Sequence, residues 1–430
     1  MSSKIKSIKA REILDSRGEP TIETKIILEN GLEAKAAVAS GASIGKFEAW
    51  ELRDNDPKRY FGKGVITACQ NVNDKIFKAL KGMDVIAQRE IDERMITLDG
   101  TENKSHLGAN AILSVSLSVA RAAAAVQKLE LWQWIRKLSP SPKNRQRDFK
   151  IRPILEDLPM PCFNLLEGGK HADNRLSFQE FWVIPVGAES FSEAMRMGSE
   201  VFHHLRESCK EKGYNTNVGD EGGLAPNLDS NDQAVELISE AIARGGFKMP
   251  SDFVLGLDVA ASSFFEQANY IFKNEGLSLS SDQMIGLYCE WVEKYPILAV
   301  EDGLAEEDWR GWVLLTQKLG EKVQIIGDDL LVTNLQRLKQ AIKKKAANAI
   351  LIKLNQIGTL TETLDCIKEA QRNNFGTIIS HRSGETCDTF IADLAVATKA
   401  GQIKTGSLSR SERICKYNRL MEIEEKINNF

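Results

Sequence analysis

Short apolar stretches in the second half of the chain share one pattern: each ends on a charged or titratable side chain. Their last residues are separated by 43, 27, 25, 28 and 23 positions. A strand, a crossover helix and two loops need about 25–30 residues, so this spacing is typical of repeated βα units. The stretches are 254–258, 297–301, 324–328, 349–353, 377–381 and 401–404, ending on Asp258, Glu301, Asp328, Lys353, His381 and Lys404.

The charge at the end of each stretch has a chemical rather than a packing explanation. A nearly continuous apolar strand is buried on both faces, as in a parallel sheet covered by helices. At the C-terminal mouth of a β/α barrel, side chains from such strand ends form the active site. We therefore expect three carboxylates, two lysines and a histidine to meet at one opening, as in a divalent-metal site with a lysine base.

Two further apolar segments precede these six and differ in spacing. They begin at Cys162 and Glu180, with only about a dozen residues between them. That is too short for a helical crossover and predicts an antiparallel pair. Together with the six stretches they make eight strands, the number that closes a small barrel.

The N-terminal region has a different pattern. Residues 21–28 alternate as a half-buried strand does, Asn30-Gly31 is a strong hairpin signal, and 34–39 supply a return strand. Residues 109–126 are apolar nearly all round, which predicts a helix buried between domains. A proline-rich, basic stretch after Leu138 is typical of a surface linker.

The expected fold is therefore α/β. It has a small N-terminal α+β domain (1–138), a linker (139–158) and an eight-stranded β/α (TIM-like) barrel (159–430) that opens with an antiparallel strand pair.

Composition narrows the class of protein. The 430 residues are 42% hydrophobic and 27% charged, as in globular proteins, and the net charge of −4 gives no reason to expect nucleic acid or an anionic membrane as partner. The seven cysteines contain no Cys-x-x-Cys pair, which favours a reducing compartment. The first residues lack a signal-peptide core, and no apolar run approaches the ~20 residues of a membrane span. We expect a cytoplasmic protein.

Asp258, Glu301 and Asp328 are the candidate metal ligands. Three carboxylates at neighbouring strand ends repel one another by several kcal/mol in a partly dry cleft, and a divalent cation removes that conflict. Oxygen ligands without cysteine or histidine indicate Mg²⁺ or Mn²⁺. The alternative is that each acid pairs with a lysine or arginine, or caps a helix.

Two lysines accompany these acids. Lys353 is a candidate base, because nearby metal cations would depress its pKa. Its alternative role is a structural salt bridge to Asp328 or Glu301. Lys404 either counters a substrate carboxylate or balances the acidic mouth.

Three other motifs could contribute chemistry. His381-Arg382-Ser383 combines groups suited to clamping a phosphate. Glu221 lies between glycines and could act as a general acid with Glu180 as partner, since two carboxylates that share a proton separate in pKa. A solvated turn is the alternative for that loop.

The glycine-rich segment 40–46 invites comparison with a P-loop. It is one residue too short, and Phe47 stands where a hydroxyl residue is required, so a nucleotide site is rejected. A lid loop whose Ser43 reaches a metal or a phosphate remains open.

The chain closely resembles the enolases, especially their bacterial branch, over essentially its whole length. The motifs that carry the resemblance lie at 15–21, 40–43, 107–113, 169–173, 179–181, 218–227, 301–303, 327–329, 353–358, 380–386 and 403–406.

The resemblance implies reversible, Mg²⁺-dependent dehydration of 2-phosphoglycerate to phosphoenolpyruvate in glycolysis and gluconeogenesis. It also implies two Mg²⁺ ions per active site, the second recruited with substrate, and at least a homodimer. By similarity Lys353 is the base and Glu221 the acid, supported by Glu180. The resemblance implies that the first Mg²⁺ is bound by Asp258, Glu301 and Asp328 and the second by Ser43. It implies that the phosphate is bound by Arg382 and Ser383. Contacts with the substrate or its surroundings are implied for His171, Gln179, His381 and Lys404.

Two departures from the family pattern bear on the site. Ile44 replaces a threonine in the lid loop. Glu167 replaces an asparagine and is expected to add negative charge near a loop that approaches phosphate, which predicts weaker affinity.

Two other functions compete with this one. The first is a different metal-assisted α-proton abstraction, such as acid-sugar dehydration. The second is a scaffold or surface-binding protein with weak or no turnover.

Overall fold

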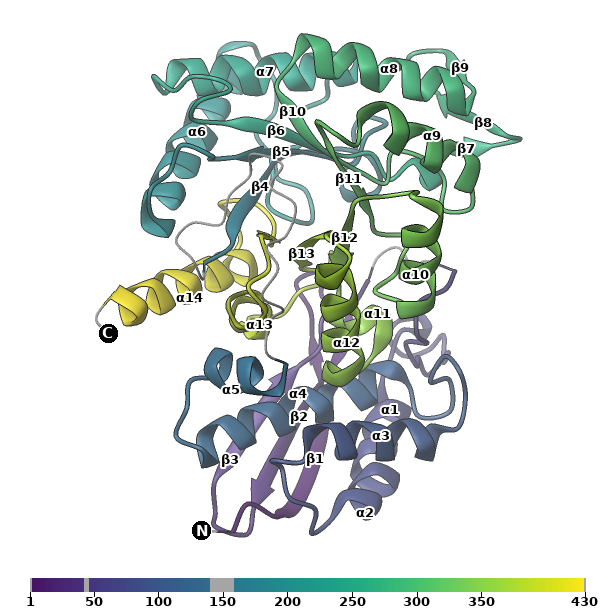
Figure 1. Ribbon diagram of the computed structural model, residues 1–430, viewed down its shortest axis with the longest axis vertical. Helices are drawn as coiled ribbons and strands as arrows, with labels where there is room; N and C mark the ends of the chain where they lie inside the picture. Colours follow the sequence, from purple (N-terminus) through teal and green to yellow (C-terminus); the bar gives the residue numbers. More distant parts are fainter. Residues whose placement is uncertain (1, 42–45, 140–157, 429–430) are drawn as a thin grey trace.

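A computed structural model describes residues 2–41, 46–139 and 158–428. Figure 1 shows two layers stacked along the long axis, with an N-terminal sheet and its helices below and a barrel above. The chain passes from the lower part into the upper part between α5 and β4.

The N-terminal sheet has three antiparallel strands in the order β1-β2-β3 (Ile5–Leu14, Pro20–Leu28 and Glu33–Ala37). Its β2 and β3 confirm the predicted hairpin. The turn between them uses Gly31 at a positive φ of 85°, where glycine carries no steric penalty. Sequence reasoning missed β1, whose polar and apolar positions alternate less regularly.

Helices cover one face of this sheet. They are α1 (Ile66–Gln70), α2 (Phe77–Leu80), α3 (Gln88–Asp99), α4 (Ala109–Val126) and α5 (Leu131–Leu138). The predicted buried helix is α4, which contacts β2 and β3 on one side and α11 and α12 of the barrel on the other. It is long and apolar enough to cross a membrane, but 83% of it is buried inside the protein, as expected of a core helix.

The barrel closes in the order β4-β5-β6-β10-β11-β12-β13-β14. These strands are Met160–Glu167, Glu180–Ile184, Val254–Asp258, Ile297–Glu301, Gln324–Gly327, Ala349–Ile352, Gly376–Ser380 and Gln402–Lys404. All six predicted βα strands are present, and β4 and β5 form the predicted antiparallel pair. The fold is the expected α/β architecture.

One reversed strand decides what reaches the mouth of the barrel. Because β5 runs antiparallel to both β4 and β6, its first residue lies level with the last residues of its neighbours. The register pairs Glu167 with Glu180, Glu180 with Asp258, and Asp258 with Glu301. Four carboxylates from four adjacent strands thus stand in one row.

Helices surround the barrel (Figure 1). They are α6 (Phe191–Glu211), α7 (Asn231–Arg244), α8 (Ser281–Lys294), α9 (Trp309–Leu319), α10 (Leu335–Lys344), α11 (Leu354–Ile357), α12 (Leu360–Arg372), α13 (Phe390–Thr398) and α14 (Ser411–Asn428). A small sheet of β7 (Phe265–Glu266), β8 (Asn269–Phe272) and β9 (Leu277–Leu279) is inserted between β6 and α8. This insertion explains the one long interval of 43 residues in the strand spacing.

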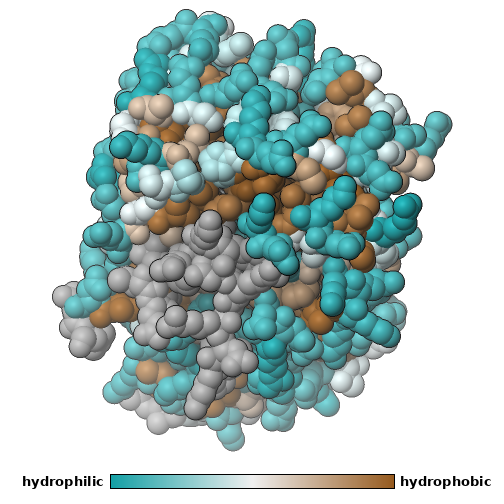
Figure 2. Space-filling model, turned by 45° about the horizontal axis from the view of Figure 1, so that its top comes forward, coloured by the Kyte–Doolittle hydropathy of each residue, from teal (hydrophilic) through white to brown (hydrophobic). Residues whose placement is uncertain are grey.

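The N-terminal domain reaches the mouth of the barrel directly. Ser40 and Gly384 exchange two backbone hydrogen bonds, with N–O distances of 2.7 and 2.9 Å. The Ser40 hydroxyl donates to Asp15 at 2.5 Å. Figure 2 shows a mostly hydrophilic outer face, with hydrophobic residues gathered in a band across its middle.

The close pairing of β5 with β6 depends on a glycine, Gly256, which has no side chain. Gly256 lies opposite Trp182, and a Cβ there would stand 2.8 Å from the indole ring. We predict that Gly256→Ala lowers the free energy of unfolding by about 1–3 kcal/mol through overpacking, measured by denaturant titration.

Gly286→Ala is the matched control, because a Cβ at this position in α8 meets no atom within 4 Å. It should raise the free energy of unfolding by about 0.5–1 kcal/mol. Equal effects of the two substitutions would contradict the packing argument.

Candidate active site

The mouth of the barrel encloses a cavity of about 230 Å³. This is below the ~300–1,000 Å³ of pockets for drug-sized ligands and favours a small substrate. Nearly all predicted site residues that the structure describes line it, together with Lys46 and Lys170. Glu301 lies just beneath, bonded to a lining lysine. Ser43 and Ile44 lie outside the described residues.

Lys404 holds the acidic row together. Its Nζ lies 2.9 Å from Glu180, 3.0 Å from Asp258 and 2.9 Å from Glu301, and all four side chains are buried. Burial lowers the pKa of Lys404, but the surrounding carboxylates outweigh burial and hold that pKa well above its usual range. Of the two roles predicted for Lys404, balancing the acidic mouth is the one seen here.

Lys353 makes the salt bridge that was its alternative role. Its Nζ donates to Asp328, which also accepts from Gln356 at 2.9 Å. Burial lowers the pKa of Lys353, but the carboxylates, Asp328 first and then Glu301, raise it, and the net pKa is raised. The depression expected from nearby metal cations stays a prediction.

Acidic side chains here outnumber the cations that could neutralise them. Burial and the neighbouring Asp258 raise the pKa of Glu301 well above its usual range. Burial, Asp329 and Asp328 do the same for the pKa of Asp302. Such shifts mark carboxylates that lack a sufficient counter-charge.

Two clusters among the described residues bring three ligand atoms within 4.8 Å of one another: Asp302, Asp328 and Asp329, and His171, Glu180 and Glu221. The predicted trio is not among them, since Lys404 binds two of its members and Lys353 the third. Only Asp328 belongs to both the predicted trio and a cluster. The all-oxygen cluster suits a hard divalent cation such as Mg²⁺.

His171 lies between the proposed acid and its partner. Its Nδ1 is 3.4 Å from Glu180 and 3.7 Å from Glu221. Burial lowers the pKa of His171, but Glu221 and Glu180 raise it to about 9, so this ring carries charge at neutral pH.

The two carboxylates do separate in pKa, in the opposite sense to the prediction. Burial and Glu221 raise the pKa of Glu180 to about 7. Burial also raises the pKa of Glu221, but His381, His171 and Arg413 lower it further, to well below its usual range. Glu180 rather than Glu221 is therefore the member poised to hold a proton.

His381 has a defined tautomer. Its Nδ1 lies 2.7 Å from Arg413, and a guanidinium can only donate, so Nδ1 accepts. Burial lowers the pKa of His381 to about 3, so the ring is neutral and its proton is on Nε2, 3.0 Å from Glu221. The Nε2 proton therefore faces Glu221, although the pair does not reach hydrogen-bonding geometry.

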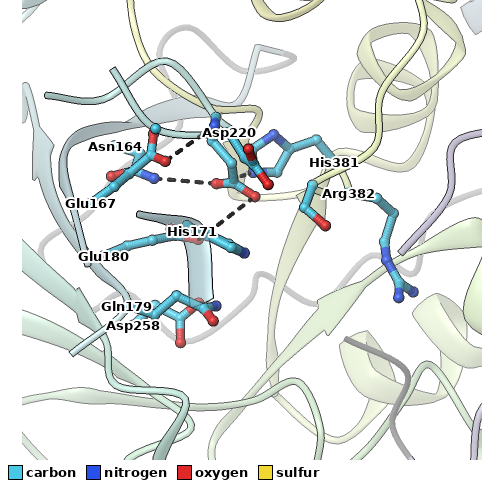
Figure 3. Close-up of polar contacts among 12 residues, drawn as sticks. Asn164, Glu167, His171, Gln179, Glu180, Asp220, Asp258, His381 and Arg382 are labelled. Carbon is cyan, nitrogen blue, oxygen red and sulfur yellow. Dashed lines mark hydrogen bonds and ion pairs between the residues drawn. The ribbon is translucent and has the colours of Figure 1, made fainter. Parts of the chain in front are cut away.

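The two residues predicted to clamp a phosphate, Arg382 and Ser383, both line the cavity. Arg382 donates to Glu48 at 2.9 Å and to Asn355 at 3.1 Å, and Figure 3 shows it pointing away from His171 and Glu180. Gln179 donates to Asp258 at 3.3 Å and so supports a predicted ligand.

Glu167 is fully buried and is not among the residues that line the cavity. Its carboxylate contacts the loop of Glu221. Its expected effect on phosphate affinity stays a prediction.

Sequence reasoning missed several residues of the site. Arg413 donates to the carbonyls of Arg382 and Ser383 and, at 3.1 Å, to that of Asp220. The signal was a charge on the apolar face of a helix, one turn before Tyr417. Asn164 donates to Glu221 at 3.2 Å, and nothing in its apolar surroundings in the sequence indicated this.

Family models cover nearly the whole chain. The model described as the enolase N-terminal domain matches residues 5–135, and that of the enolase C-terminal TIM barrel domain matches residues 156–430. The chain belongs to the enolase family. Its assignment to the bacterial branch stays a prediction.

Membership of the enolase family agrees with the site described above. The family supports a hydro-lyase of the enolase superfamily that binds small phosphorylated acids. The acidic clusters supply ligands for the metal on which such enzymes depend.

The buried acids of this enolase-family site make its stability depend on pH. Burial and Glu221 raise the pKa of Glu167 to about 8, so the folded protein holds a proton that the unfolded chain releases near pH 4–5. Stability is thus lost as pH rises from about 5 to about 8. Glu180 and His171 act in the same direction, with raised pKa values of about 7 and about 9.

We predict that Glu167→Gln makes this decline shallower, because an amide does not titrate. The measurement is the denaturant midpoint in EDTA at about pH 6 and about pH 8.5. Glu424→Gln, at a buried carboxylate outside the site, should leave the decline unchanged. Parallel declines in wild type and Glu167→Gln would refute the assignment.

Proposed function

We propose that this protein is a phosphopyruvate hydratase, which reversibly dehydrates 2-phosphoglycerate to phosphoenolpyruvate. One observation carries the proposal. A lysine, a buried acid pair, a carboxylate cluster and an arginine–serine pair line a single small cavity. These are the groups needed to remove a C2 proton, expel a C3 hydroxyl, hold a metal and bind a phosphate.

The chemistry divides between two residues. Lys353, as the neutral amine that is formed when its ammonium proton is lost to solvent, takes the C2 proton, and the C3–O bond breaks as the C2=C3 double bond forms. Glu221 gives its proton to the departing hydroxyl, which leaves as water. The negative charge of the bound phospho-acid raises the pKa of Glu221 and so favours the protonated form that this step needs.

The surrounding residues orient the reactants. The neutral His381 and charged His171 fix the Glu221 carboxylate from two sides. Arg382 and Ser383 are proposed to bind the substrate phosphate, for which Arg382 exchanges its contact with Glu48.

The donor set fits magnesium. Asp258, Glu301 and Asp328 are proposed to hold one ion, and Ser43 with the phosphate a second. When bound, Mg²⁺ would offset the charge on the substrate carboxylate and release Lys353 and Lys404 from their carboxylates. A lysine or histidine base with one or two Mg²⁺ ions is the established pattern of the superfamily. By the same family argument the protein is proposed to be at least a homodimer.

The first test follows ultraviolet absorbance of the enol-phosphate double bond with 2-phosphoglycerate. Wild type should give a rise that requires Mg²⁺ and stops in EDTA. Lys353→Ala should lower kcat by roughly 10²–10⁴-fold, the usual contribution of a positioned base.

Lys339→Ala, at an exposed lysine on α10, is the control and should retain wild-type activity. No Mg²⁺-dependent rise in wild type would refute the proposed function.

Acid-sugar dehydration is disfavoured by the arginine–serine pair in the cavity. The scaffold alternative is tested by thermal melting. A functional site should show a Tm that rises with Mg²⁺ and rises further with 2-phosphoglycerate, because ligands that bind only the folded state stabilise it. An unchanged Tm would favour the scaffold role.

A further inference from the structure

Glu167 makes two contacts with the loop that carries Glu221. It is the last residue of β4 and fully buried. Its Oε1 accepts from the backbone N–H of Gly223 at 2.5 Å, and its Oε2 from that of Glu221 at 3.2 Å. Figure 3 shows Glu167 beside Asn164, both directed at the loop of Asp220.

Backbone pairing docks the same loop on the same strand. The N–H of Glu167 donates to the carbonyl of Leu224 at 2.9 Å, and Leu224 donates to Leu165 at 2.8 Å. Glu167 thus holds residues 221–224, its carboxylate at Glu221 and Gly223 and its main chain at Leu224.

The loop is shaped around this carboxylate. A Cβ at Gly219 would collide with the Glu167 carboxylate, and a Cβ at Gly223 would lie 3.0 Å from Oε1. Both glycines therefore make room for a two-oxygen acceptor. Ionised Glu167, the form present above its pKa of about 8, offers both oxygens as acceptors, whereas an amide of the same size presents only one and its NH₂ group faces the second backbone N–H.

Charged groups face Glu167 from several elements. Burial and Glu221 raise its pKa, while His171 and the two backbone N–H groups lower it. The charged or titratable side chains gathered around Glu221 are His171, Glu180, His381, Lys404 and Arg413. None of them accepts from the backbone N–H groups of Glu221 and Gly223: Arg413 donates to the carbonyl of Asp220, and the others act on the Glu221 side chain.

We propose that Glu167 is a positioning residue that holds the backbone of Glu221, and with it the proposed acid, in line with the C3 hydroxyl. The inference rests on the proposed function. Glu167 contacts neither Lys353 nor the proposed metal ligands in the described structure. Its loss should therefore slow departure of the C3 hydroxyl while leaving removal of the C2 proton intact.

The experiment separates these two events in D₂O. Exchange of the C2 proton of 2-phosphoglycerate, followed by NMR, reports proton removal, and formation of phosphoenolpyruvate reports dehydration. Glu167→Gln should lower kcat for dehydration by roughly 10–100-fold, as expected when a reacting group is displaced by about 1 Å. Exchange at C2 and KM should stay near wild type.

Glu424→Gln is the matched control. Glu424 is also a buried carboxylate that accepts from two backbone N–H groups, those of Phe191 at 2.5 Å and Ser192 at 2.9 Å, but it caps α6 far from the cavity. This variant should lose stability and keep both rates.

Each outcome decides the proposal. A selective loss of dehydration supports it, with partial recovery in Glu167→Asp, which keeps both oxygens on a shorter side chain. Unchanged rates, or a parallel fall of exchange and dehydration, overturn it. If Glu167→Gln does not fold, the ratio of the dehydration rate to the C2 exchange rate, measured in Glu167→Asp, decides instead. Absence of both reactions in wild type would instead refute the proposed function.

Discussion

Repulsion among buried carboxylates at one end of the barrel is the constraint around which this protein is organised. The reversed strand β5 brings Glu180 into the row formed by Glu167, Asp258 and Glu301. Like charges in a buried site cost several kcal/mol unless they are neutralised or protonated. Lys404 and Lys353 supply the neutralising charge, and each pairs with carboxylates that are also proposed to hold a divalent ion.

This arrangement explains how an acidic cavity and a stable fold coexist. The lysines proposed to take part in the reaction also neutralise the buried carboxylates of the folded protein. Arg413 also has more than one role. Its buried guanidinium connects the loop after β13 to the loop of Glu221 through backbone carbonyls, and it fixes the tautomer of His381. Removing any of these groups would therefore affect both folding and chemistry.

The proposed acid, Glu221, is held differently from the proposed base, Lys353. Lys353 is held by a direct ion pair to a strand-end carboxylate, whereas Glu221 sits on a loop that needs support from β4, from Asn164 and from two histidines. A loop has few local constraints of its own, so the precision of its one reactive side chain depends on neighbours that are distant in sequence. Glu167 is the closest of these neighbours to the loop backbone.

The sequence by itself determined the barrel, because six buried strands at a regular interval and one short antiparallel pair leave few other topologies. It also determined which residues reach the mouth, because the charged residue that ends each buried parallel strand lies at the C-terminal face of the barrel. It did not determine which charges pair: Lys353 with Asp328, Lys404 with three acids, and Arg382 with Glu48. Nor could it place Asn164, Glu167 or Arg413, whose partners lie on other elements. Pairing and pKa depend on distances of a few ångströms between strands far apart in the chain, and only the packed tertiary structure sets those distances.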